Sequence, residues 1–395
     1  MVKVFIFIIK EEREQMNFSF TEGQELLREN IIKFMKKECP VEYVRECDEQ
    51  KRAPLDLFHR IAEQGWLGLA IPEEYGGSGG TAVDIAILLE ETAKFSFALG
   101  DLIYRARIHG GMNIEKFGTE EQKKEYLPKI AKGGLIFCIS LTEPNSGSDA
   151  ASLSTAAVPD GDEFVVNGNK MFTTNLHIAD YCLLYTRTDR SASKHKGITV
   201  FIVDAKSQGI EINPIKTMGF WATTTNDVVY NNVRVPAKNI FGKLNEGWNV
   251  ATGQLGGERF GLAALCTGGS QAVLNDSLRY ARDRVQFGKS IGKFQAISHK
   301  LADMQVEVDV SRLLTYRLAW MLSQGIFDIK MAAITKLYAT EAYKNISDMG
   351  LQILGGYGYT MEYDIQRHFR DSRLLTIGGG SSEIQRNIIA KSLDL

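Results

Sequence analysis

The spacing of hydrophobic residues changes twice along the chain. From residue 21 to about 132, apolar residues recur at helical spacing. From about 135 to 242 the chain has short runs rich in β-branched and aromatic residues, separated by turn signals. From 246 onward helical spacing returns in long segments. The pattern predicts a helical part, a β part and a second helical part, with long C-terminal helices at 272–287, 297–322, 328–354 and 383–392.

The β part is expected to form an antiparallel sheet, because no helical pattern lies between its strands as a parallel sheet would require. The fold class is therefore α+β, with a C-terminal bundle of long helices. We expect strands at 164–167, 181–186, 198–203, 210–215, 228–230 and 233–235. We expect an N-terminal helical domain at 16–134, a β domain at 135–245 and a helical bundle at 246–395.

Residues 1–15 are expected to be a non-native or disordered extension, with Met16 as an alternative start of translation. The apolar run 2–9 is shorter than the ~20 residues that a membrane span needs, and charged residues follow it directly. It also lacks a small-residue cleavage site, which argues against a secretory signal. The segment therefore predicts no membrane span.

Composition excludes several classes of protein. The chain of 395 residues has 46 Lys plus Arg and 48 Asp plus Glu, and its net charge of −2 gives no basis for binding nucleic acid or an anionic membrane. With 44% hydrophobic and 24% charged residues, the composition is that of a globular protein. The 5 cysteines show no C-x-x-C spacing, which favours the reducing cytoplasm over a disulfide framework or a structural zinc site. No H-E-x-x-H pair occurs, and we predict no catalytic metal.

Four motifs occur in one order along the chain. They are Pro72-Glu-Glu-Tyr-Gly-Gly77, Leu141-Thr-Glu-Pro-Asn-Ser-Gly-Ser-Asp149, Arg284-Val-Gln-Phe-Gly288 with Gln295, and Gln352-Ile-Leu-Gly-Gly356 with Gly380-Ser-Ser-Glu-Ile-Gln-Arg386. With these motifs the chain resembles, from Phe18 onward, the acyl-CoA dehydrogenase family. The resemblance implies an FAD flavoprotein, usually a homotetramer, that desaturates acyl thioesters of CoA or of a carrier protein. It also implies an electron-transfer flavoprotein or a similar acceptor as partner.

The segment 142–149 combines hydroxyl side chains with a flexible glycine, so its N–H groups could converge on an anion such as a pyrophosphate. A plain turn is the alternative. The resemblance implies that residues 139–148 cover the flavin, with Leu141 and Thr142 facing the ring. Ser148 is also expected to touch the pantetheine arm of the substrate. The predicted FAD contacts in this segment are Ile139, Leu141, Thr142, Gly147 and Ser148.

Two further segments are expected at the FAD. Phe172 would shield the flavin from water, unless it fills the core of the β domain, and Thr173 and Thr174 would lie beside the ring. From the residues alone, Phe287-Gly288 predicts a helix end with a glycine C-cap. The resemblance implies that a C-terminal set contacts the adenosine and pyrophosphate of the FAD in a neighbouring subunit; this set comprises Arg284, Gln286, Phe287, Gln295, Gln352, Gly355 and Gly356.

The end of the chain is expected to contribute to the same cofactor. Ser382 and Gln385 have the spacing of a capping box, which predicts a helix start after three glycines. The resemblance adds flavin contacts by Ser381 and Glu383. A helix N-terminus beside a diphosphate is favourable in either account.

Desaturation requires a carboxylate beside the α-carbon of the thioester while a hydride passes to flavin N5. Most family members carry that Glu where this chain has Gly379. The branch with the isovaleryl-CoA and long-chain enzymes places it on a helix directly before an Arg, and Glu258-Arg259 matches that site. We predict Glu258 as the base, with an exposed Glu–Arg pair as the alternative. Arg259 and Gly380 are expected at the substrate, and the N–H of Gly379 in an oxyanion-hole role.

Three positions remain open at this stage. Arg105 and Arg107 fall where relatives build the far end of the acyl pocket, and a buried unpaired Arg would favour a substrate with a carboxylate tail. Exposed arginines are the commoner case. Trp221 stands where family members often have Arg.

A flavin-dependent monooxygenase and a non-catalytic acyl-thioester binder of the same fold are the alternative functions.

Overall fold

The computed structural model describes residues 18–394. The N-terminal helical part is followed by strands and then by the long C-terminal helices, which confirms the predicted order. The helices of the first part are α1 (Glu22–Glu38), α2 (Val41–Glu49), α3 (Leu55–Glu63), α4 (Ala82–Ala93), α5 (Phe97–Tyr104), the π-helical η3 (Arg105–Met112), α6 (Asn113–Phe117) and α7 (Glu120–Ala131). The predicted extension at 1–15 lies outside the described residues.

The β part forms one mixed sheet in which the neighbouring strands follow the order β6-β7-β3-β2-β4-β5-β8, with β1 also paired to β4. Its strands are β1 (Phe137–Ser140), β2 (Ala156–Asp160), β3 (Glu163–Thr174), β4 (Tyr181–Arg187), β5 (Ile198–Asp204), β6 (Ile210–Pro214), β7 (Thr225–Pro236) and β8 (Ile240–Phe241). The antiparallel prediction is right for the long pairs β3–β7 and β4–β5. It is wrong for β1, which runs parallel to β4, and for the short contact between β2 and β4, which is also parallel. The chain between β1 and β4 passes through β2 and β3 rather than a helix, and this allows the parallel pair without a crossover helix.

The C-terminal part consists of α8 (Gly247–Gly253), α9 (Leu255–Asp283), the short hairpin strands β9 (Val285–Gln286) and β10 (Lys289–Ser290), α10 (Gln295–Ser323), α11 (Ile329–Leu354), α12 (Ile365–Leu375) and α13 (Ser382–Lys391). The predicted helices agree with α10, α11 and α13. The helix predicted at 272–287 is the second half of α9, which begins much earlier and ends before the hairpin. Glu258 therefore lies in the first turn of α9. No helix within residues 18–394 is long and apolar enough to cross a membrane.

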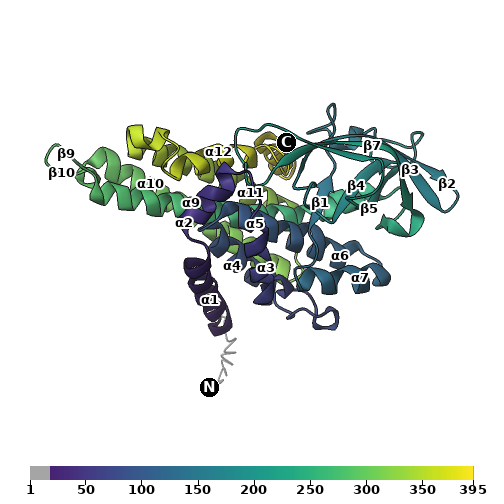
Figure 1. The fold of residues 1–395 in the computed structure, drawn as a ribbon, viewed down its shortest axis with the longest axis horizontal. Coiled ribbons are helices and arrows are strands. Elements are labelled where there is room, and N and C mark those ends of the chain that lie inside the picture. Colours follow the sequence, from purple (N-terminus) through teal and green to yellow (C-terminus); the bar gives the residue numbers. More distant parts are fainter. Residues whose placement is uncertain (1–17, 395) are drawn as a thin grey trace, which may run out of the picture.

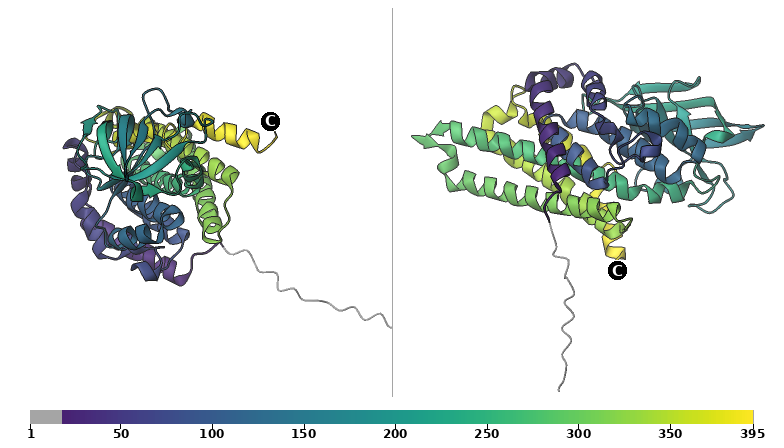
Figure 2. Two further views of the ribbon diagram at one scale, coloured as in Figure 1. Left: turned by 90° about the vertical axis from the view of Figure 1, so that its right-hand side faces the viewer. Right: turned by 90° about the horizontal axis from the view of Figure 1, so that it is seen from below.

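The molecule is elongated, with the sheet at one end and the β9–β10 hairpin at the other (Figure 1). The long helices α9, α10 and α11 run between these two ends, and the right-hand view of Figure 2, seen from below, shows the same arrangement. Helix α9 packs against α4, α10 and α11. A Cβ at Gly268 of α9 would lie 2.3 Å from the carbonyl oxygen of Glu90 on α4, so glycine allows the two helices to approach closely.

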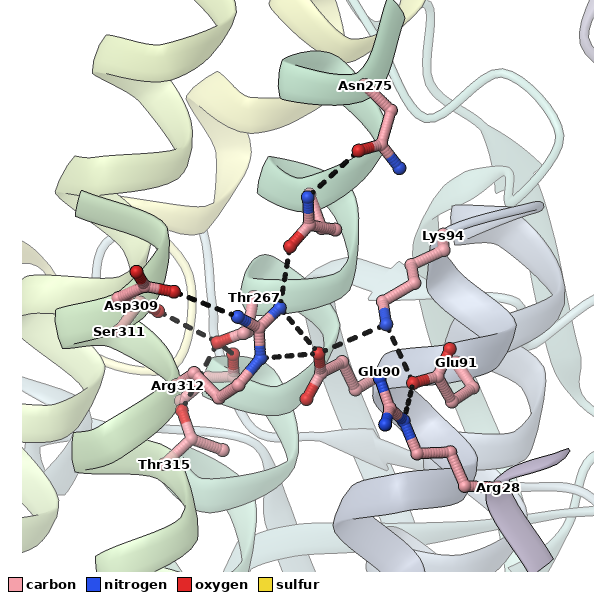
Figure 3. Close-up of polar contacts among 12 residues, drawn as sticks. Arg28, Glu90, Glu91, Lys94, Thr267, Asn275, Asp309, Ser311, Arg312 and Thr315 are labelled. Carbon is pink, nitrogen blue, oxygen red and sulfur yellow. Dashed lines mark hydrogen bonds and ion pairs between the residues drawn. The ribbon is translucent and has the colours of Figure 1, made fainter. Parts of the chain in front are cut away.

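Helix α4 is the central helix of the molecule, because every residue from Ile85 to Ala93 is buried. Two of those residues are charged, and their charges are paired in the protein interior (Figure 3). Glu91 accepts a hydrogen bond of 2.8 Å from Nε of Arg28, and Glu90 accepts one of 2.9 Å from Nε of Arg312. Lys94 lies within 3.4 Å of both carboxylates. A buried carboxylate is stable only when it is paired, and the arginine partners of these two carboxylates come from other helices. The network therefore joins α1, α4 and α10.

Candidate active site

The predicted base and the predicted oxyanion-hole residue lie side by side. A Cβ built on Gly379 would be 3.6 Å from Oε1 of Glu258 and 2.8 Å from Cδ1 of Leu262. The N–H of Gly379 donates no hydrogen bond within residues 18–394. The fold therefore brings a carboxylate and a free N–H donor, more than a hundred residues apart in the sequence, to one place.

The environment of Glu258 alters its acidity. Burial raises the pKa of Glu258 above its ordinary value, although Arg259, Lys336 and Arg105 act to lower it. A general base with a raised pKa has more driving force for taking a proton from carbon. The carboxylate forms no ion pair within 4.0 Å in the described part of the chain, so the alternative of an exposed Glu–Arg pair does not describe this site.

The arginines near the site differ in their partners. Arg105 forms a bidentate ion pair with Asp101, with Nε···Oδ2 at 2.8 Å and Nη2···Oδ1 at 3.1 Å. Because its charge is paired, the argument for a carboxylate-tailed substrate does not apply to Arg105. Arg259 is 1% exposed, and its Nε and Nη1 have no hydrogen-bond partner within residues 18–394. Arg107 is 0% exposed, and none of its three guanidinium nitrogens has a hydrogen-bond partner within residues 18–394, so the argument for a polar or carboxylate-tailed substrate applies to Arg107 rather than to Arg105.

The 141–149 loop presents free donors at the edge of the sheet. The N–H groups of Leu141, Thr142, Gly147 and Ser148 donate no hydrogen bond within residues 18–394. Phe172 is 59% exposed and has a φ of 59° at a bulge of β3, so it does not fill the core. The main chain of Met171 donates to the carbonyl oxygen of Thr142 at 2.8 Å, which places the two segments in contact. A flat aromatic ring beside several unpaired N–H groups fits a flavin with its polar ring edge and its phosphates.

A buried ion pair holds the 141–149 loop in place. Nζ of Lys170 donates to Oε1 of Glu143 at 2.8 Å and to the carbonyl oxygen of Leu141 at 3.0 Å. Glu143 also accepts the N–H groups of Ser154 and Thr155 at 2.7 Å and 2.8 Å. Burial by itself raises the pKa of Glu143, but Lys170 and these donors together lower it to about 2. Sequence reasoning missed this pair, because nothing in the local pattern links two charges 27 residues apart.

Contacts through Arg105 connect the loop region to Glu258. Its partner Asp101 also accepts a hydrogen bond of 3.0 Å from Asn175, the residue after Thr174. Arg105 lies beside Cys138, the residue before Ile139, and its charge reaches Glu258. Thr174 and Thr173 bond to Thr225 and Ser140 at 3.1 Å and 3.2 Å. The residues predicted to cover the flavin and the predicted base therefore belong to one region.

The C-terminal set predicted to bind the adenosine part of FAD lies elsewhere. Arg284, Gln286, Phe287, Gly355 and Gly356 line a cavity of about 690 Å³. Gln295 and Gln352 are exposed and do not line it. The cavity lies at the hairpin end of the molecule, whereas the 141–149 loop belongs to the sheet at the other end (Figure 1). One chain thus does not bring the two groups of predicted FAD contacts together.

The segment around Phe287 corrects one prediction. Helix α9 ends at Asp283, and residues 285–290 form a two-stranded hairpin instead of a helix end with a glycine C-cap. Phe287 and Gly288 have φ values of 50° and 77° at the tip, as a two-residue hairpin turn requires. The hairpin leaves the Phe287 side chain 93% exposed.

The glycine turn before α13 corrects another prediction. The N-cap is Ser381, whose Oγ accepts the N–H of Ile384 at 3.4 Å, and the predicted Ser382–Gln385 capping box is absent. Gln385 instead donates to the carbonyl oxygens of Gly380 and Gly379, at 2.8 Å and 3.3 Å. Glu383 is exposed in the first turn of α13, next to the Gly379 region. Lys336, which sequence reasoning did not select, donates to Gly380 from α11.

The ring of Trp221 contacts two cations. The guanidinium carbon of Arg370 lies 3.7 Å from the centre of its ring, and Nζ of Lys51 lies 5.8 Å from it. The indole Nε1 donates to the carbonyl oxygen of Thr217 at 3.0 Å. The ring thus takes part in a structural contact between the segment before β7 and α12.

Comparison with known proteins identifies the class. Residues 21–134, 138–233 and 245–393 match the N-terminal, middle and C-terminal domain models of acyl-CoA dehydrogenases. A probable acyl-CoA dehydrogenase of Bacillus subtilis is 39% identical over 380 residues, which cover 96% of this chain and 100% of that protein. The structure of butyryl-CoA dehydrogenase from Megasphaera elsdenii superposes with a TM-score of 0.92 at 33% identity, covering 96% of this chain and 100% of that one. The chain belongs to the acyl-CoA dehydrogenase family, and it is an oxidoreductase that uses FAD.

Further relatives show the range of names within the family. An FAD complex of PigA has a TM-score of 0.89 and 28% identity, and covers 96% of this chain and 100% of that one. The prolyl acyl carrier protein oxidase AnaB has a TM-score of 0.89 and 31% identity, with 95% and 100% covered. The caffeyl-CoA reductase-Etf complex subunit CarC of Acetobacterium woodii is 36% identical over 375 residues, with 95% and 99% covered.

Proposed function

We propose that the protein catalyses the α,β-desaturation of a short, branched or functionalised acyl thioester, with Glu258 as the base that removes the α-proton. The observation that carries the proposal is the position of the Glu258 carboxylate beside the free N–H of Gly379. As the α-proton leaves, negative charge develops on the thioester oxygen, and an N–H donor there stabilises it by roughly 3 kcal/mol. Bound FAD supplies the acceptor for the β-hydride.

The residues present fit FAD in the manner expected from the sequence. The free N–H groups of the 141–149 loop would hold the flavin and its phosphates, and Phe172 would exclude water from the ring. Ser381 and Glu383 at the start of α13 would close the site, with Ser148 and Gly380 toward the substrate. Arg259 would add positive charge beside the reacting carboxylate.

The packing around Glu258 supports a short acyl group. A Cβ at Gly261 would meet the ring of Tyr104 at 2.6 Å and Ile108 at 3.0 Å, and one at Gly257 would meet Met112 at 3.3 Å. Helix α9 and η3 are therefore in direct contact along the face of α9 that carries Gly257 and Gly261. A long straight acyl chain running along that face would have to separate them, whereas a short or compact group would not. The name of the butyryl-CoA enzyme agrees with this proposal.

The carrier and the acceptor are part of the proposal. The relatives include a CoA-linked reductase from an Etf complex and an acyl carrier protein oxidase, so both thioester carriers occur among similar proteins. We propose an acyl-CoA substrate and an electron-transfer flavoprotein as acceptor. A location in the cytoplasm is consistent with the free thiols of Cys39, Cys47, Cys138, Cys182 and Cys266.

We further propose a homotetramer. Arg284 and Gln286 lie at the hairpin end of the molecule, so they can reach an FAD only if a second subunit places its flavin region there. Helix α10 carries an exposed apolar stripe of Val306, Leu313 and Trp320, which are 60%, 58% and 54% exposed. A spacing of seven places them on one face of the helix, and such a stripe marks an interface. Native mass spectrometry of the FAD-loaded protein tests the state, and a monomer that retains FAD contradicts it.

Anaerobic titration tests the chemistry. The FAD-loaded protein would be titrated with short, branched, cyclic and dicarboxylic acyl-CoAs while the flavin absorbance near ~450 nm is followed. We expect bleaching by one class of thioester, its loss in Glu258→Gln, and its retention in Glu121→Gln, where an exposed carboxylate on α7 is changed. Bleaching that persists in Glu258→Gln would remove Glu258 from the mechanism. If no CoA thioester bleaches the flavin, carrier-bound substrates and oxygen-dependent chemistry become the next tests.

A further inference from the structure

The turn that carries Gly379 is flexible by composition but is held from outside. Residues 378–380 are all glycine, and Gly379 and Gly380 have φ values of 64° and 83°. Such a sequence loses much backbone entropy on ordering. Two side chains secure it: Nζ of Lys336 donates to the carbonyl oxygen of Gly380 at 2.9 Å, and Nε2 of Gln385 donates to the same oxygen at 2.8 Å.

Lys336 is unusual among the lysines of the described chain. Its side chain is 0% exposed, and it forms no ion pair within 4.0 Å, so the carbonyl oxygen of Gly380 is its hydrogen-bond acceptor. A buried ammonium without a close counter-ion is costly and needs a compensating role. On the same helix, Lys330 has the ordinary arrangement, since its side chain is exposed. The two lysines therefore form a matched pair for comparison.

The groups that face Lys336 come from two helices. Glu258, Arg259 and Cys266 of α9 and Glu341 of α11 act on its charge. A Cβ at Gly379 would lie 3.9 Å from Cε of Lys336 and 3.6 Å from Oε1 of Glu258, so the lysine and the carboxylate both border the glycine turn. The ammonium thus contacts, at the carbonyl oxygen of Gly380, the turn whose N–H is free.

We propose that Lys336 is a positioning residue for the reaction: it fixes the Gly379–Gly380 turn so that the Gly379 N–H meets the thioester oxygen, and it supplies positive charge behind that turn as the oxygen becomes negative. The proposal rests on the proposed function. Lys336 touches neither reacting atom, and it acts through the turn and through the field at Glu258. Its main effect is on the transition state, because the thioester oxygen carries little charge before the proton leaves.

Lys336→Met removes the donor and the charge while keeping the length of the side chain. We expect faster amide hydrogen exchange in residues 377–385 of the FAD-loaded protein without substrate. We also expect kcat for flavin reduction to fall about tenfold or more with little change in KM, as for an interaction made only in the transition state. Lys330→Met, the matched control, should leave both quantities at the wild-type values.

The pH profile separates positioning from mere stability. Burial lowers the pKa of Lys336 to about 8, while the thiol of Cys266 has its pKa raised to about 12 and stays neutral in that range. Protonated Lys336 is present below its pKa, so the wild-type rate should decline as the pH rises through about 8. The decline should be absent in Lys336→Met. A purely structural lysine would not produce this limb.

A second variant keeps the test decisive if Lys336→Met folds poorly. Gln385→Leu removes the other tether without touching the buried charge, and it should loosen the turn while keeping the alkaline limb. The proposal is overturned if Lys336→Met exchanges and reacts as the wild type does, or if the alkaline limb persists in it. If no acyl thioester reduces the wild-type flavin, the proposed function fails. Hydrogen exchange in the same proteins then still decides whether Lys336 holds the turn.

Discussion

Replacing Glu143 by glutamine tests what holds the 141–149 loop beside the flavin. The carboxylate is 5% exposed and accepts Lys170, Ser154 and Thr155, so it connects the loop to β3 and to the start of β2. Glutamine keeps the shape but loses the charge, and its single amide oxygen can accept only one of the two N–H groups, because they bond to different carboxylate oxygens. The change therefore removes the ion pair with Lys170 together with one backbone hydrogen bond.

Two routes give a similar magnitude. The pKa of Glu143 falls from 4.5 to about 2 in the folded protein, which at about 1.4 kcal/mol per pKa unit corresponds to about 3 kcal/mol. Independently, removing one partner of a buried pair costs about 3–5 kcal/mol, because the other charge stays buried. Lys170 is 0% exposed and would keep only the carbonyl oxygen of Leu141. We expect Glu143→Gln to lower the free energy of unfolding by about 3 kcal/mol and to weaken FAD retention.

Urea unfolding at several pH values provides the assay. Because the folded pKa of Glu143 lies below the unfolded value, its stabilisation is complete above pH 4.5 and is lost as the pH falls from 4.5 towards 2. On this basis, the difference in the free energy of unfolding between the wild type and Glu143→Gln should be constant between pH 7 and pH 5 and should shrink below pH 4.5. Titration of the apoprotein with FAD, followed by flavin fluorescence, measures the effect on the loop itself.

Matched variants decide whether the reasoning holds. Asp149→Asn breaks the exposed pair of Asp149 with Lys194, both about half exposed, and should change stability by less than about 0.5 kcal/mol. The double variant Glu143→Gln/Lys170→Met leaves no buried charge and should be less destabilised than Glu143→Gln alone. If Glu143→Gln is as stable as the wild type, or if the double variant loses the sum of both single changes, the ion pair does not hold the loop.

Three further predictions concern the base, the turn and the bundle. Since burial raises the pKa of Glu258 and the base must be deprotonated, kcat/KM should fall with decreasing pH at a midpoint above 4.5, and a midpoint at or below 4.5 refutes the assignment. At Gly379, φ is 64° and a Cβ would lie 2.8 Å from a leucine side chain. Gly379→Ala should therefore lower the free energy of unfolding by about 1–3 kcal/mol and slow flavin reduction, whereas Gly378→Ala should be tolerated. Arg312→Met leaves the carboxylate of Glu90 with a more distant partner and should destabilise the protein by about 3 kcal/mol in thermal unfolding; an unchanged midpoint would show that the pair is dispensable.

The order of helical and β segments follows from local spacing, and it could be predicted because each long segment repeats its own period many times. Helices α10 and α11 each exceed 25 residues, which makes the periodic signal strong. The four-residue β1 gives almost no signal, and its partner β4 lies more than forty residues away. The parallel pairing could not be predicted, because it depends on tertiary contacts rather than on local pattern.

Local signals were also insufficient where a non-glycine residue adopts left-handed backbone geometry. Phe287 has a φ of 50° in the hairpin turn, although phenylalanine is not a typical residue at such a position. The helical pattern of α9 continues up to that point, so the sequence favoured a helix end. Ser382 and Gln385 had the right spacing for a capping box, but the glycine carbonyls compete for the Gln385 amide.

The candidate site was predictable where the resemblance supplied a position and unpredictable where buried charges pair over long distances. Glu258 and Gly379 were selected through the family pattern, and the fold brings them together. Glu143, Lys170 and Lys336 were not selected, because a charged residue in a sequence is normally exposed. Their burial shows only in the folded chain, where each has a specific acceptor or donor.

The absence of a side chain at Gly379 and the presence of one at Glu258 are two parts of one arrangement. A Cβ at position 379 would be obstructed by Cδ1 of Leu262 at 2.8 Å and would be in van der Waals contact with the Glu258 carboxylate at 3.6 Å, so a longer side chain on the turn would compete with that carboxylate for space. A glutamate at both positions would place two carboxylates in contact, and one of them would stay protonated at neutral pH. A protonated carboxyl cannot remove the α-proton. A second carboxylate that took no part in the reaction would repel the negative charge that develops on the enolate. With the base on α9, the turn is left to provide only its N–H, and glycine with its φ of 64° provides it at the lowest steric cost.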